Sequence, residues 1–321
     1  MLRCAALDDY QDVTRRMGDW DRLEGRVELQ AITRHIAVRD KLVAAIKDCA
    51  IVIAMRERTT FDRALIERLP NLKLLVTTGM RNASVDVEAA VARGITVCGT
   101  QGSVGTTAEL AWGLILGLLR FIPEESANLR RGGAWQTTVG RDLQGRRLGV
   151  VGLGNLGARV AKVGRAFDLP VSGWSRSLTL EKAKSLDIDH CAELDDLLRA
   201  SDIVTIHLAL NAETRHILDA RRLALLKPGA ILVNTARGPL VDEAALIAAL
   251  ESGGLAGAAL DVYGEEPLPA DHPFRRLPNV LATPHLGYVT ERTYQAFFRG
   301  AIEDIEAWLA GKPVRVLGQP A

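Results

Sequence analysis

The sequence predicts an α/β protein that folds into two domains, each built on an open parallel sheet. A chain of 321 residues is long enough for about two domains of ordinary size. Short apolar runs alternate with helix-like stretches in two separate series, one before residue 100 and one after residue 147. This alternation is typical of parallel strands joined by crossover helices, so the two series predict two sheets.

A long apolar stretch, Thr106–Arg120, follows the first series and predicts a helix. Gly113 and Gly117 lie four residues apart on one face of that helix. Their spacing allows another backbone to approach closely, and burial in a core is an equal alternative. The first series itself predicts strands at Leu2–Leu7, Val27–Leu29, Ala50–Ala54, Leu72–Val76 and Ile95–Val97, with helices at Arg39–Ile46, Phe61–Leu69 and Asp86–Ala92.

The second series begins at Arg147 and ends with a helical pattern from Thr290 to Leu309. Inside it, Lys227-Pro228-Gly229 marks a turn, because Pro and Gly supply the backbone geometry that turns require. The remaining expected strands are Leu148–Val151, Pro170–Trp174, Ile203–Ile206, Ala230–Asn234 and Ala256–Leu260, with helices at Leu156–Phe167, Glu193–Ala200, Ala220–Leu225 and Glu243–Glu251.

Composition argues against several classes of protein. Forty Lys and Arg residues nearly equal 39 Asp and Glu residues, so the net charge of +1 provides no general attraction to nucleic acid or to an anionic membrane. The longest apolar run, Leu110–Leu119, is shorter than the roughly 18 residues of a membrane span. The first residues lack the apolar segment of a signal peptide. Four scattered cysteines without a C-x-x-C pair predict no metal site and suit a reducing cytoplasm.

A glycine-rich turn predicts a dinucleotide site of the Rossmann type. Gly152, Gly154 and Gly157 stand where an apolar run changes into a helical pattern. The first glycine permits a tight turn, the second lets backbone N–H groups reach a pyrophosphate, and the third lets helix and strand pack closely. The helix N-terminus adds partial positive charge at the same place. A second strand ends about twenty residues later, so the context favours a nucleotide site over a turn alone.

Downstream of this turn, three segments stand out: VNTARGPLVDEAAL (233–246), LDVYGEEP (260–267) and LATPHLG (281–287). GRRLGVVGLGNLG (145–157) contains the turn itself, and RERT (56–59) and TTGMRNASVDVEAAVARGITV (77–97) lie upstream of it. Together they resemble the D-2-hydroxyacid dehydrogenase family, which reduces 2-keto acids with a nicotinamide cofactor. The resemblance implies a flavodoxin-like substrate domain, residues 1–98 and 285–321, into which a nucleotide-binding domain, residues 99–284, is inserted.

The resemblance implies three catalytic residues, and the chemistry of their side chains agrees with it. Arg237 offers a planar guanidinium that binds a carboxylate through two hydrogen bonds. His285 is the expected proton donor and acceptor, because imidazole titrates near neutrality. Glu266, directly before Pro267, is expected to orient that imidazole and favour its charged form. The alternatives are a surface ion pair for Arg237 and a helix-entry carboxylate for Glu266.

The end of the strand expected after the glycine turn, Pro170–Trp174, indicates which nicotinamide cofactor is preferred. Dinucleotide sites often place Asp or Glu there, which binds the ribose 2′-hydroxyl of NAD and repels the 2′-phosphate of NADP. This chain has Ser175 and Arg176 instead. Serine removes the repulsion and arginine forms charge-assisted bonds with phosphate, so NAD(P)(H) is expected, with NADP(H) favoured over NAD(H). The alternative is that Arg176 stacks on adenine or points to solvent and either cofactor is accepted.

The resemblance also assigns further residues to binding. His207 is expected beside the cofactor, and Asp261 is expected to accept a hydrogen bond from the nicotinamide carboxamide unless it is a simple turn residue. Arg56 either reaches the far end of the substrate or is a solvated charge, and the bulky Tyr288 limits the pocket. The expected cofactor residues are Gly152, Gly154, Asn155, Leu156, Gly157, Ser175, Arg176, His207, Thr235, Ala236, Asp261 and Gly287, and the expected substrate residues are Arg56, Thr78, Gly79, Met80 and Arg81.

These features predict an NAD(P)-dependent D-2-hydroxyacid dehydrogenase that acts on a small 2-keto or 2-hydroxy acid. One alternative is a noncatalytic, nucleotide-sensing module on the same fold. Another is a different NAD enzyme, such as a formate dehydrogenase or an adenosylhomocysteine hydrolase, although their motifs match poorly around residue 285. A homodimer is expected through Thr106–Arg120, because an apolar run with small residues is better buried than exposed and because this region pairs subunits in the family.

Overall fold

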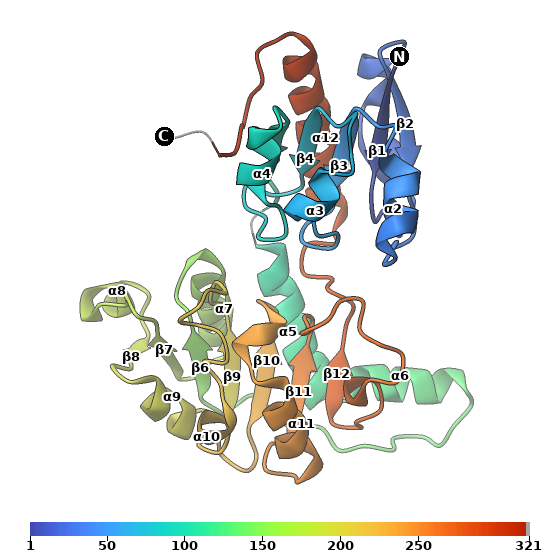
Figure 1. Ribbon diagram of the computed structural model, residues 1–321. Helices are drawn as coiled ribbons and strands as arrows, with labels where there is room; N and C mark the ends of the chain where they lie inside the picture. Colours follow the sequence, from blue (N-terminus) through green and yellow to red (C-terminus); the bar gives the residue numbers. More distant parts are fainter. Residues whose placement is uncertain (104, 319–321) are drawn as a thin grey trace. The chain divides into compact units, whose positions relative to one another are not determined.

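The structure, a computed structural model, describes residues 1–103 and 105–318 and divides into two compact units. Unit 1 is formed by Met1–Ser103 with Val289–Ala321, and unit 2 by Val104–Tyr288. Each unit has its own open parallel sheet, so the predicted α/β class with two such sheets is confirmed (Figure 1). The boundaries proposed from the sequence, after residues 98 and 284, differ from this division by a few residues.

Unit 1 contains a five-stranded sheet in the order β2-β1-β3-β4-β5, and every pairing is parallel. The strand order reverses its direction between β1 and β3, so the carboxyl ends of these two strands form the switch point at which sheets of this kind bind ligands. The strands are Leu2–Ala6 (β1), Val27–Ala31 (β2), Ile51–Ala54 (β3), Leu74–Thr77 (β4) and Thr96–Gly99 (β5); the helices are Thr14–Met17 (α1), Trp20–Leu23 (η1, a 3₁₀ helix), Arg39–Ile46 (α2), Arg63–Ile66 (α3), Val87–Ala92 (α4) and Glu291–Leu309 (α12).

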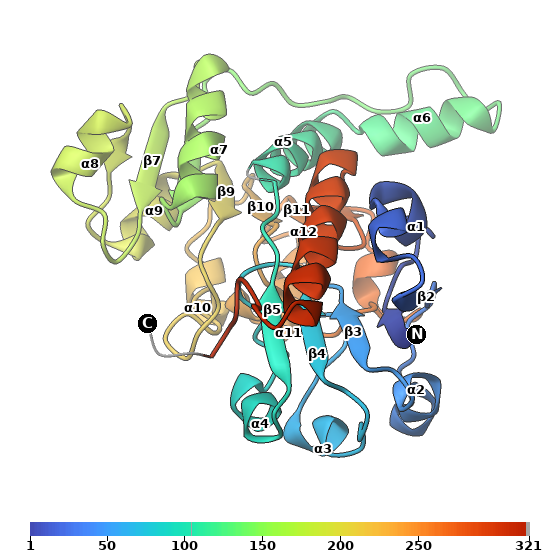
Figure 2. The same ribbon diagram turned by 90° about the horizontal axis from the view of Figure 1, so that it is seen from above.

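Helix α12 covers one face of the unit 1 sheet (Figure 2). Its N-terminus is capped by Thr290, whose side chain accepts a hydrogen bond from the N–H of Thr293. Ile302 and Ile305 are buried in a cluster with residues of β1, β3 and β4. The C-terminal part of the chain therefore completes the core that the N-terminal strands begin.

Unit 2 contains a seven-stranded parallel sheet in the order β12-β11-β10-β9-β6-β7-β8, whose switch point lies between β6 and β9. Parallel strands need helices on both faces, and the alternating sequence supplies them. The strands are Leu148–Val151 (β6), Val171–Trp174 (β7), Asp189–His190 (β8), Ile203–Ile206 (β9), Ile231–Asn234 (β10), Gly257–Leu260 (β11) and Val280–Ala282 (β12); the helices are Thr106–Leu119 (α5), Ile122–Arg130 (α6), Asn155–Ala166 (α7), Leu180–Ser185 (α8), Leu194–Ala200 (α9), Ala220–Leu223 (α10) and Glu243–Glu251 (α11), with 3₁₀ helices Gly238–Leu240 (η2) and Pro273–Arg275 (η3).

Helix α5 buries its apolar residues inside unit 2, in agreement with the alternative of a buried core helix. The Trp112 indole N–H donates to the carbonyl of Val160 in α7, at 3.2 Å. A Cβ at Gly117 would lie 3.0 Å from the side chain of Leu281, so this glycine allows close packing within the unit. The apolar run of α5 therefore needs no partner subunit to be buried.

Among the described residues, no single helix is long and apolar enough to cross a membrane. Helices α5 and α6 meet the length and composition requirement only when taken together, and they are bent by 66° at the break between them.

Candidate active site

The glycine turn lies at the switch point of the seven-stranded sheet. Gly152 follows β6 with a φ of +101°, which glycine adopts without steric strain. A Cβ at Gly152 would lie 2.7 Å from the carbonyl oxygen of His207, at the end of β9. A Cβ at Gly157 would lie 1.9 Å from the carbonyl oxygen of Gly152. Gly157 therefore lets α7 pack against β6, and Gly152 lets the turn pass close to the chain after β9.

The N-terminus of α7 has the properties of an anion site. Its N-cap residue, Gly154, has no side chain that could accept a hydrogen bond from the first turn. A Cβ at Gly154 would meet no atom within 4 Å, and Gly154 and Asn155 are exposed. Uncapped N–H groups and the partial positive charge of a helix N-terminus suit a phosphate group. The residues present therefore fit the pyrophosphate of a dinucleotide.

Ser175 and Arg176 lie next to this turn. Trp174, the last residue of β7, accepts a hydrogen bond from the N–H of Gly152 at 2.8 Å, and Ser175 follows it directly. The Arg176 guanidinium, whose side chain is 54% exposed, forms an ion pair with Glu213. Sequence analysis missed Glu213, because no local pattern relates two positions on different loops.

A tight turn fixes the backbone at Glu213. The Asn211 side chain accepts hydrogen bonds from the N–H groups of Glu213 and Thr214, both at 3.0 Å. The Thr214 hydroxyl donates to the carbonyl of Ala209 at 2.8 Å. An ordered turn therefore presents a carboxylate to the arginine that follows β7.

The end of β10 is organised by Asn234, which sequence analysis also missed. Asn234 is 1% exposed; its side chain accepts from the N–H of Ala236 at 3.0 Å and donates to the carbonyl of Arg237 at 2.9 Å. The hydroxyl oxygen of Thr235 is buried and has no hydrogen-bond partner among the described residues. Buried polar atoms are normally satisfied, so this hydroxyl suits a polar group of a bound cofactor. The sequence did offer a signal for this role: an asparagine at a strand end often accepts a hydrogen bond from the backbone N–H two residues later and so orders the following turn.

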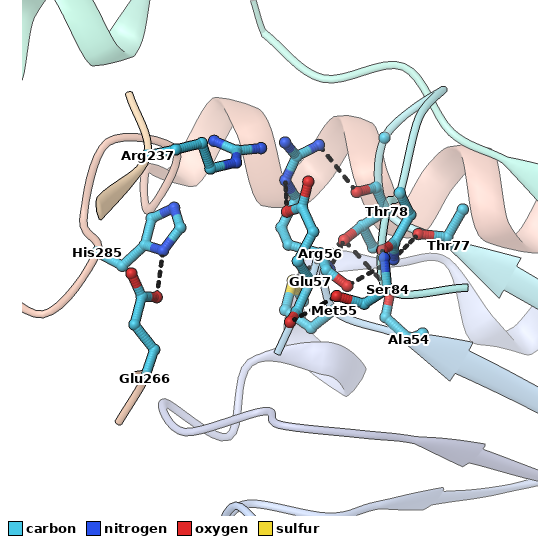
Figure 3. A network of polar contacts seen from close by, with 12 residues as sticks. Ala54, Met55, Arg56, Glu57, Thr77, Thr78, Ser84, Arg237, Glu266 and His285 are labelled. Atoms are coloured by element: carbon cyan, nitrogen blue, oxygen red, sulfur yellow. Dashed lines mark hydrogen bonds and ion pairs between the residues drawn. The ribbon is translucent and has the colours of Figure 1, made fainter. Parts of the chain in front are cut away.

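His285 and Glu266 form a close imidazole–carboxylate pair. The distance between Nδ1 of His285 and Oε2 of Glu266 is 2.5 Å, and the two side chains are 15% and 25% exposed. Because Nδ1 faces the carboxylate, Nε2 is the ring nitrogen left to exchange a proton. In the view of Figure 3 the imidazole lies between Glu266 and Arg237. The ring of Tyr288 packs edge-on against the imidazole, with centroids 5.5 Å apart.

Asp261 anchors the segment that follows His285. It is fully buried, and its carboxylate accepts hydrogen bonds from the Thr283 hydroxyl (2.6 Å) and the N–H groups of Leu286 (2.7 Å) and Gly287 (2.8 Å). Burial raises the pKa of Asp261, while these hydrogen bonds act in the opposite direction. Since protein contacts occupy Asp261 and the N–H of Gly287, their contact with the nicotinamide stays a prediction.

His207 is held as a neutral imidazole. Burial lowers the pKa of His207 to about 4, and its Nε2 lies 2.9 Å from the Thr205 hydroxyl. An imidazole with this pKa is neutral at neutral pH, so it carries no imidazolium proton to donate. The place of His207 beside the cofactor stays a prediction.

In unit 1, Arg56 lies against the loop predicted to hold a carboxylate. The Arg56 N–H donates to the Thr78 hydroxyl at 2.9 Å, and its guanidinium donates to the Thr78 carbonyl at 3.2 Å (Figure 3). Gly79 has a φ of +117°, and a Cβ there would lie 2.0 Å from the Arg56 guanidinium. The Gly79 N–H lies 3.3 Å from the Thr100 hydroxyl, while Met80 and Arg81 are exposed. The structure thus brings Arg56 together with Thr78 and Gly79.

A glycine turn at the switch point of a parallel sheet, with an imidazole–carboxylate pair in the same unit, defines a dinucleotide-binding protein of the dehydrogenase class. Residues 112–287, more than half of the chain, match the family model described as D-isomer specific 2-hydroxyacid dehydrogenase, NAD binding domain. The chain belongs to the D-isomer-specific 2-hydroxyacid dehydrogenase family.

Two curated relatives and one solved structure illustrate this membership. The D-3-phosphoglycerate dehydrogenase of Methanocaldococcus jannaschii is 39% identical over 277 residues, which are 85% of this chain and 52% of that protein. The glyoxylate reductase of Aeropyrum pernix is 39% identical over 260 residues, 78% of this chain and 77% of that protein. The phosphoglycerate oxidoreductase of Vibrio cholerae has a TM-score of 0.93 at 35% identity, covering 97% of this chain and all of that one. The chain thus spans about half the length of the phosphoglycerate dehydrogenase.

Proposed function

We propose that this chain is an NAD(P)-dependent D-2-hydroxyacid dehydrogenase that works as a reductase of small 2-keto acids. The observation that carries the proposal is the 2.5 Å contact between His285 Nδ1 and Glu266 Oε2, in the unit that also contains the glycine turn and Arg237. A nucleotide sensor needs the glycine turn and has no use for a proton donor oriented by a carboxylate. The relatives named as dehydrogenases and reductases support the same conclusion.

Each polar group has a defined task in this reaction. The reduced nicotinamide, when bound, supplies a hydride to the carbonyl carbon. The Nε2–H of His285 gives its proton to the carbonyl oxygen, so that the product is the hydroxyl compound, and the same nitrogen takes the proton back in oxidation. Glu266 stabilises the charged imidazole and keeps Nδ1 turned toward itself. Arg237 binds the substrate carboxylate and polarises the adjacent carbonyl.

We assign Arg56 and the loop Thr78–Arg81 to the substrate as well. The Arg56 guanidinium, which lies against the glycine-containing loop, offers side-chain donors to an anion. The printed names of the relatives point to glyoxylate and to a phosphorylated hydroxy acid as compounds to try first.

The proposed function is tested with purified protein and a set of 2-keto acids: glyoxylate, hydroxypyruvate, pyruvate, and branched and aromatic keto acids. Oxidation of NADPH or NADH, followed by absorbance, is expected with at least one of them. Dinucleotide binding without turnover of any keto acid, or of the matching hydroxy acids in the reverse direction, would instead support the sensor alternative.

The cofactor preference follows from Arg176, and we propose that NADP(H) is favoured over NAD(H). Ser175 carries no charge to repel a 2′-phosphate, and Arg176 offers it charge-assisted bonds. Arg176→Ala is expected to lower kcat/KM for NADPH by about tenfold, the loss of one such bond at an exposed site, and to leave NADH nearly unchanged. Initial rates with one keto acid measure both values. A wild-type preference for NADH, or an equal loss with both cofactors, would contradict this reading.

The ion pair with Glu213 supplies a matched variant for the same experiment. A 2′-phosphate must displace the Glu213 carboxylate from Arg176, and exposed pairs are weak enough for this exchange. Glu213→Gln is therefore expected to raise kcat/KM for NADPH by about two- to fivefold, the range of an exposed ion pair. Opposite effects of the two variants on NADPH would link both residues to the phosphate.

We propose a homodimer, formed through α6 and the loop after it rather than through α5. No residue of α6 is buried. Four large apolar side chains gather in this segment with high exposure: Ile122 (55%), Leu129 (62%), Trp135 (78%) and Val139 (91%). Apolar groups concentrated at one place on a surface mark an interaction site, and an exposed tryptophan is a frequent anchor.

Light scattering at micromolar concentration is expected to report twice the chain mass of 34.8 kDa. Replacing Trp135 and Val139 together by Asp should restore the single-chain mass, because charge is poorly tolerated in the core of an interface. Val38→Asp, at an exposed apolar position in unit 1, is the matched control and should leave the mass doubled. A wild-type mass of one chain would refute the dimer.

The cysteines support a reducing, cytoplasmic location, which we also propose. All four are free, and Cys4, Cys49 and Cys98 are buried. Burial raises the pKa of the Cys49 thiol. Burial also raises the pKa of the Cys98 thiol, to about 12. Thiols that are buried and protonated resist oxidation and serve as small apolar core residues.

A further inference from the structure

Tyr263 contacts each of the three segments that carry Arg237, Glu266 and His285. It follows β11, is 6% exposed, and packs its ring against Phe274 with centroids 6.4 Å apart. We propose that Tyr263 is the positioning residue of this site, which holds the imidazole–carboxylate pair in its reactive geometry. The proposal rests on the proposed function, because it assigns Tyr263 a role in the same reaction.

The first contact fixes the carboxylate. The backbone N–H of Tyr263 donates to Oε1 of Glu266 at 3.0 Å. The other oxygen, Oε2, is the one that faces His285 Nδ1. With one oxygen held by the backbone, the carboxyl group cannot rotate away from the imidazole without breaking a hydrogen bond. The position of the Tyr263 main chain therefore sets the direction of the carboxylate.

The second contact fixes the turn that carries the imidazole. The Tyr263 hydroxyl lies 2.8 Å from the carbonyl oxygen of Thr283 and 3.0 Å from that of Leu260. The Thr283 carbonyl also accepts the N–H of His285 at 3.0 Å, and the Leu260 carbonyl accepts the N–H of Thr283 at 2.8 Å. The phenol has one proton, which these two carbonyls share. One hydroxyl thus ties the end of β11 to the backbone of His285.

The third contact involves the backbone beside Arg237. A Cβ at Gly238 would lie 2.1 Å from the carbonyl carbon of Tyr263 and 2.2 Å from its oxygen. Both atoms belong to the main chain, so a larger residue at 238 would displace one backbone from the other. The turn after β10 therefore packs directly on Tyr263.

The hydroxyl acts as a hydrogen-bond donor and takes no part in proton transfer. Tyr263 is buried among apolar residues, and burial raises its pKa further above the usual value for a phenol, so the group stays protonated. Both of its neighbours are backbone carbonyls, which only accept. Its contribution is therefore geometric.

Tyr263→Phe tests this role, because it removes the hydroxyl and keeps the ring and the backbone N–H. We expect kcat to fall roughly three- to thirtyfold with KM for the keto acid nearly unchanged, as small misplacements of reacting groups have large effects. The basic limb of the pH profile for reduction should also move to lower pH, because a less well placed carboxylate stabilises the imidazolium less. Steady-state rates from pH 5 to 9, a range that brackets the ordinary titration of imidazole, give all three readouts.

A second measurement needs no turnover. The proton between His285 Nδ1 and Glu266 Oε2 should give a far-downfield proton resonance in the wild-type protein, assigned by its loss in His285→Ala. In Tyr263→Phe this resonance should move upfield as the contact lengthens. If the protein turns over no keto acid, the proposed function fails, and the resonance still decides whether Tyr263 holds the pair.

Phe274→Leu is the matched control, because it loosens the same core without removing a hydrogen bond. It should lower Tm and leave both the resonance and the pH profile in place. The proposal is overturned if the resonance is absent from the wild-type protein, unchanged in Tyr263→Phe, or moved equally in Phe274→Leu.

Discussion

Replacing His285 by Ala is expected to lower kcat for keto-acid reduction roughly a hundredfold to ten-thousandfold, the usual range for a lost general acid. The physical reason is that Nε2 is the nitrogen of the His285–Glu266 pair that is free to deliver a proton, since Nδ1 lies 2.5 Å from the carboxylate. Without it, water must protonate the developing alkoxide. Single-turnover measurement with the preferred cofactor separates this loss from slow product release.

Glu266→Gln provides the graded comparison. Glutamine keeps a polar group near Nδ1 and removes the negative charge, so kcat should fall less than in His285→Ala. His272→Ala is a useful control in the same unit, because His272 lies 3.1 Å from Glu243 and has no place in the proposed chemistry. Near-normal turnover by His285→Ala would remove this residue from the mechanism.

Arg237→Lys is expected to lower kcat/KM by at least about a hundredfold, which corresponds to two hydrogen bonds to a charged group. An ammonium keeps the positive charge and cannot reproduce the planar pair of donors that a carboxylate accepts. The turn that presents this arginine is held by the buried Asn234, so a shorter side chain cannot be compensated by movement of the backbone.

A matched Arg→Lys change at Arg199, which forms an exposed pair with Asp196 one helical turn away, should leave kcat/KM unchanged. Because lysine keeps the positive charge at both positions, comparing the change in kcat/KM caused by Arg237→Lys with that caused by Arg199→Lys shows the effect of the guanidinium geometry at the site. If Arg237→Lys retained full kcat/KM, the arginine would be contributing charge alone.

Local patterns predicted the fully buried central strands well, because a parallel strand buried on both faces is typically a near-continuous apolar run. β6, β9 and α11 have the bounds expected from the sequence. Two edge strands were missed, β8 with two residues and β12 with three partly buried ones. The polar β8 has no apolar run of its own, and the apolar run of β12, Val280–Ala282, is only three residues long, so pairing with a neighbouring strand defines both.

Helix α6 was also not predicted, because its sequence has no pattern of buried positions. None of its residues is buried, so it lacks the apolar stripe by which an amphipathic helix is recognised. The apolar residues that it does carry are exposed, which is the reason for placing a subunit contact there. Periodicity reports packing within a chain, and α6 makes too little of that packing to be recognised.

The sequence by itself identified the motifs that are formed by residues close together in the chain. The glycine pattern is local in the sequence, and the contact that requires glycine at 157, with the carbonyl oxygen of Gly152, arises within one β–α unit. Arg237 at a strand end and His285 in its short motif were assigned by resemblance to the family, and their catalytic roles stay predictions. Their geometry relative to one another was not contained in those motifs.

Only the tertiary structure decided which groups hold these residues in place. Asp261 binds the N–H groups after His285, Glu213 pairs with Arg176, and the Tyr263 hydroxyl joins the carbonyls of two segments. These contacts connect loops that follow different strands, and parallel strands adjacent in the sheet lie far apart in the chain. The physical reason is that hydrogen bonds and ion pairs act over a few ångströms in space, so a partner supplied by another strand leaves no periodic trace in the sequence.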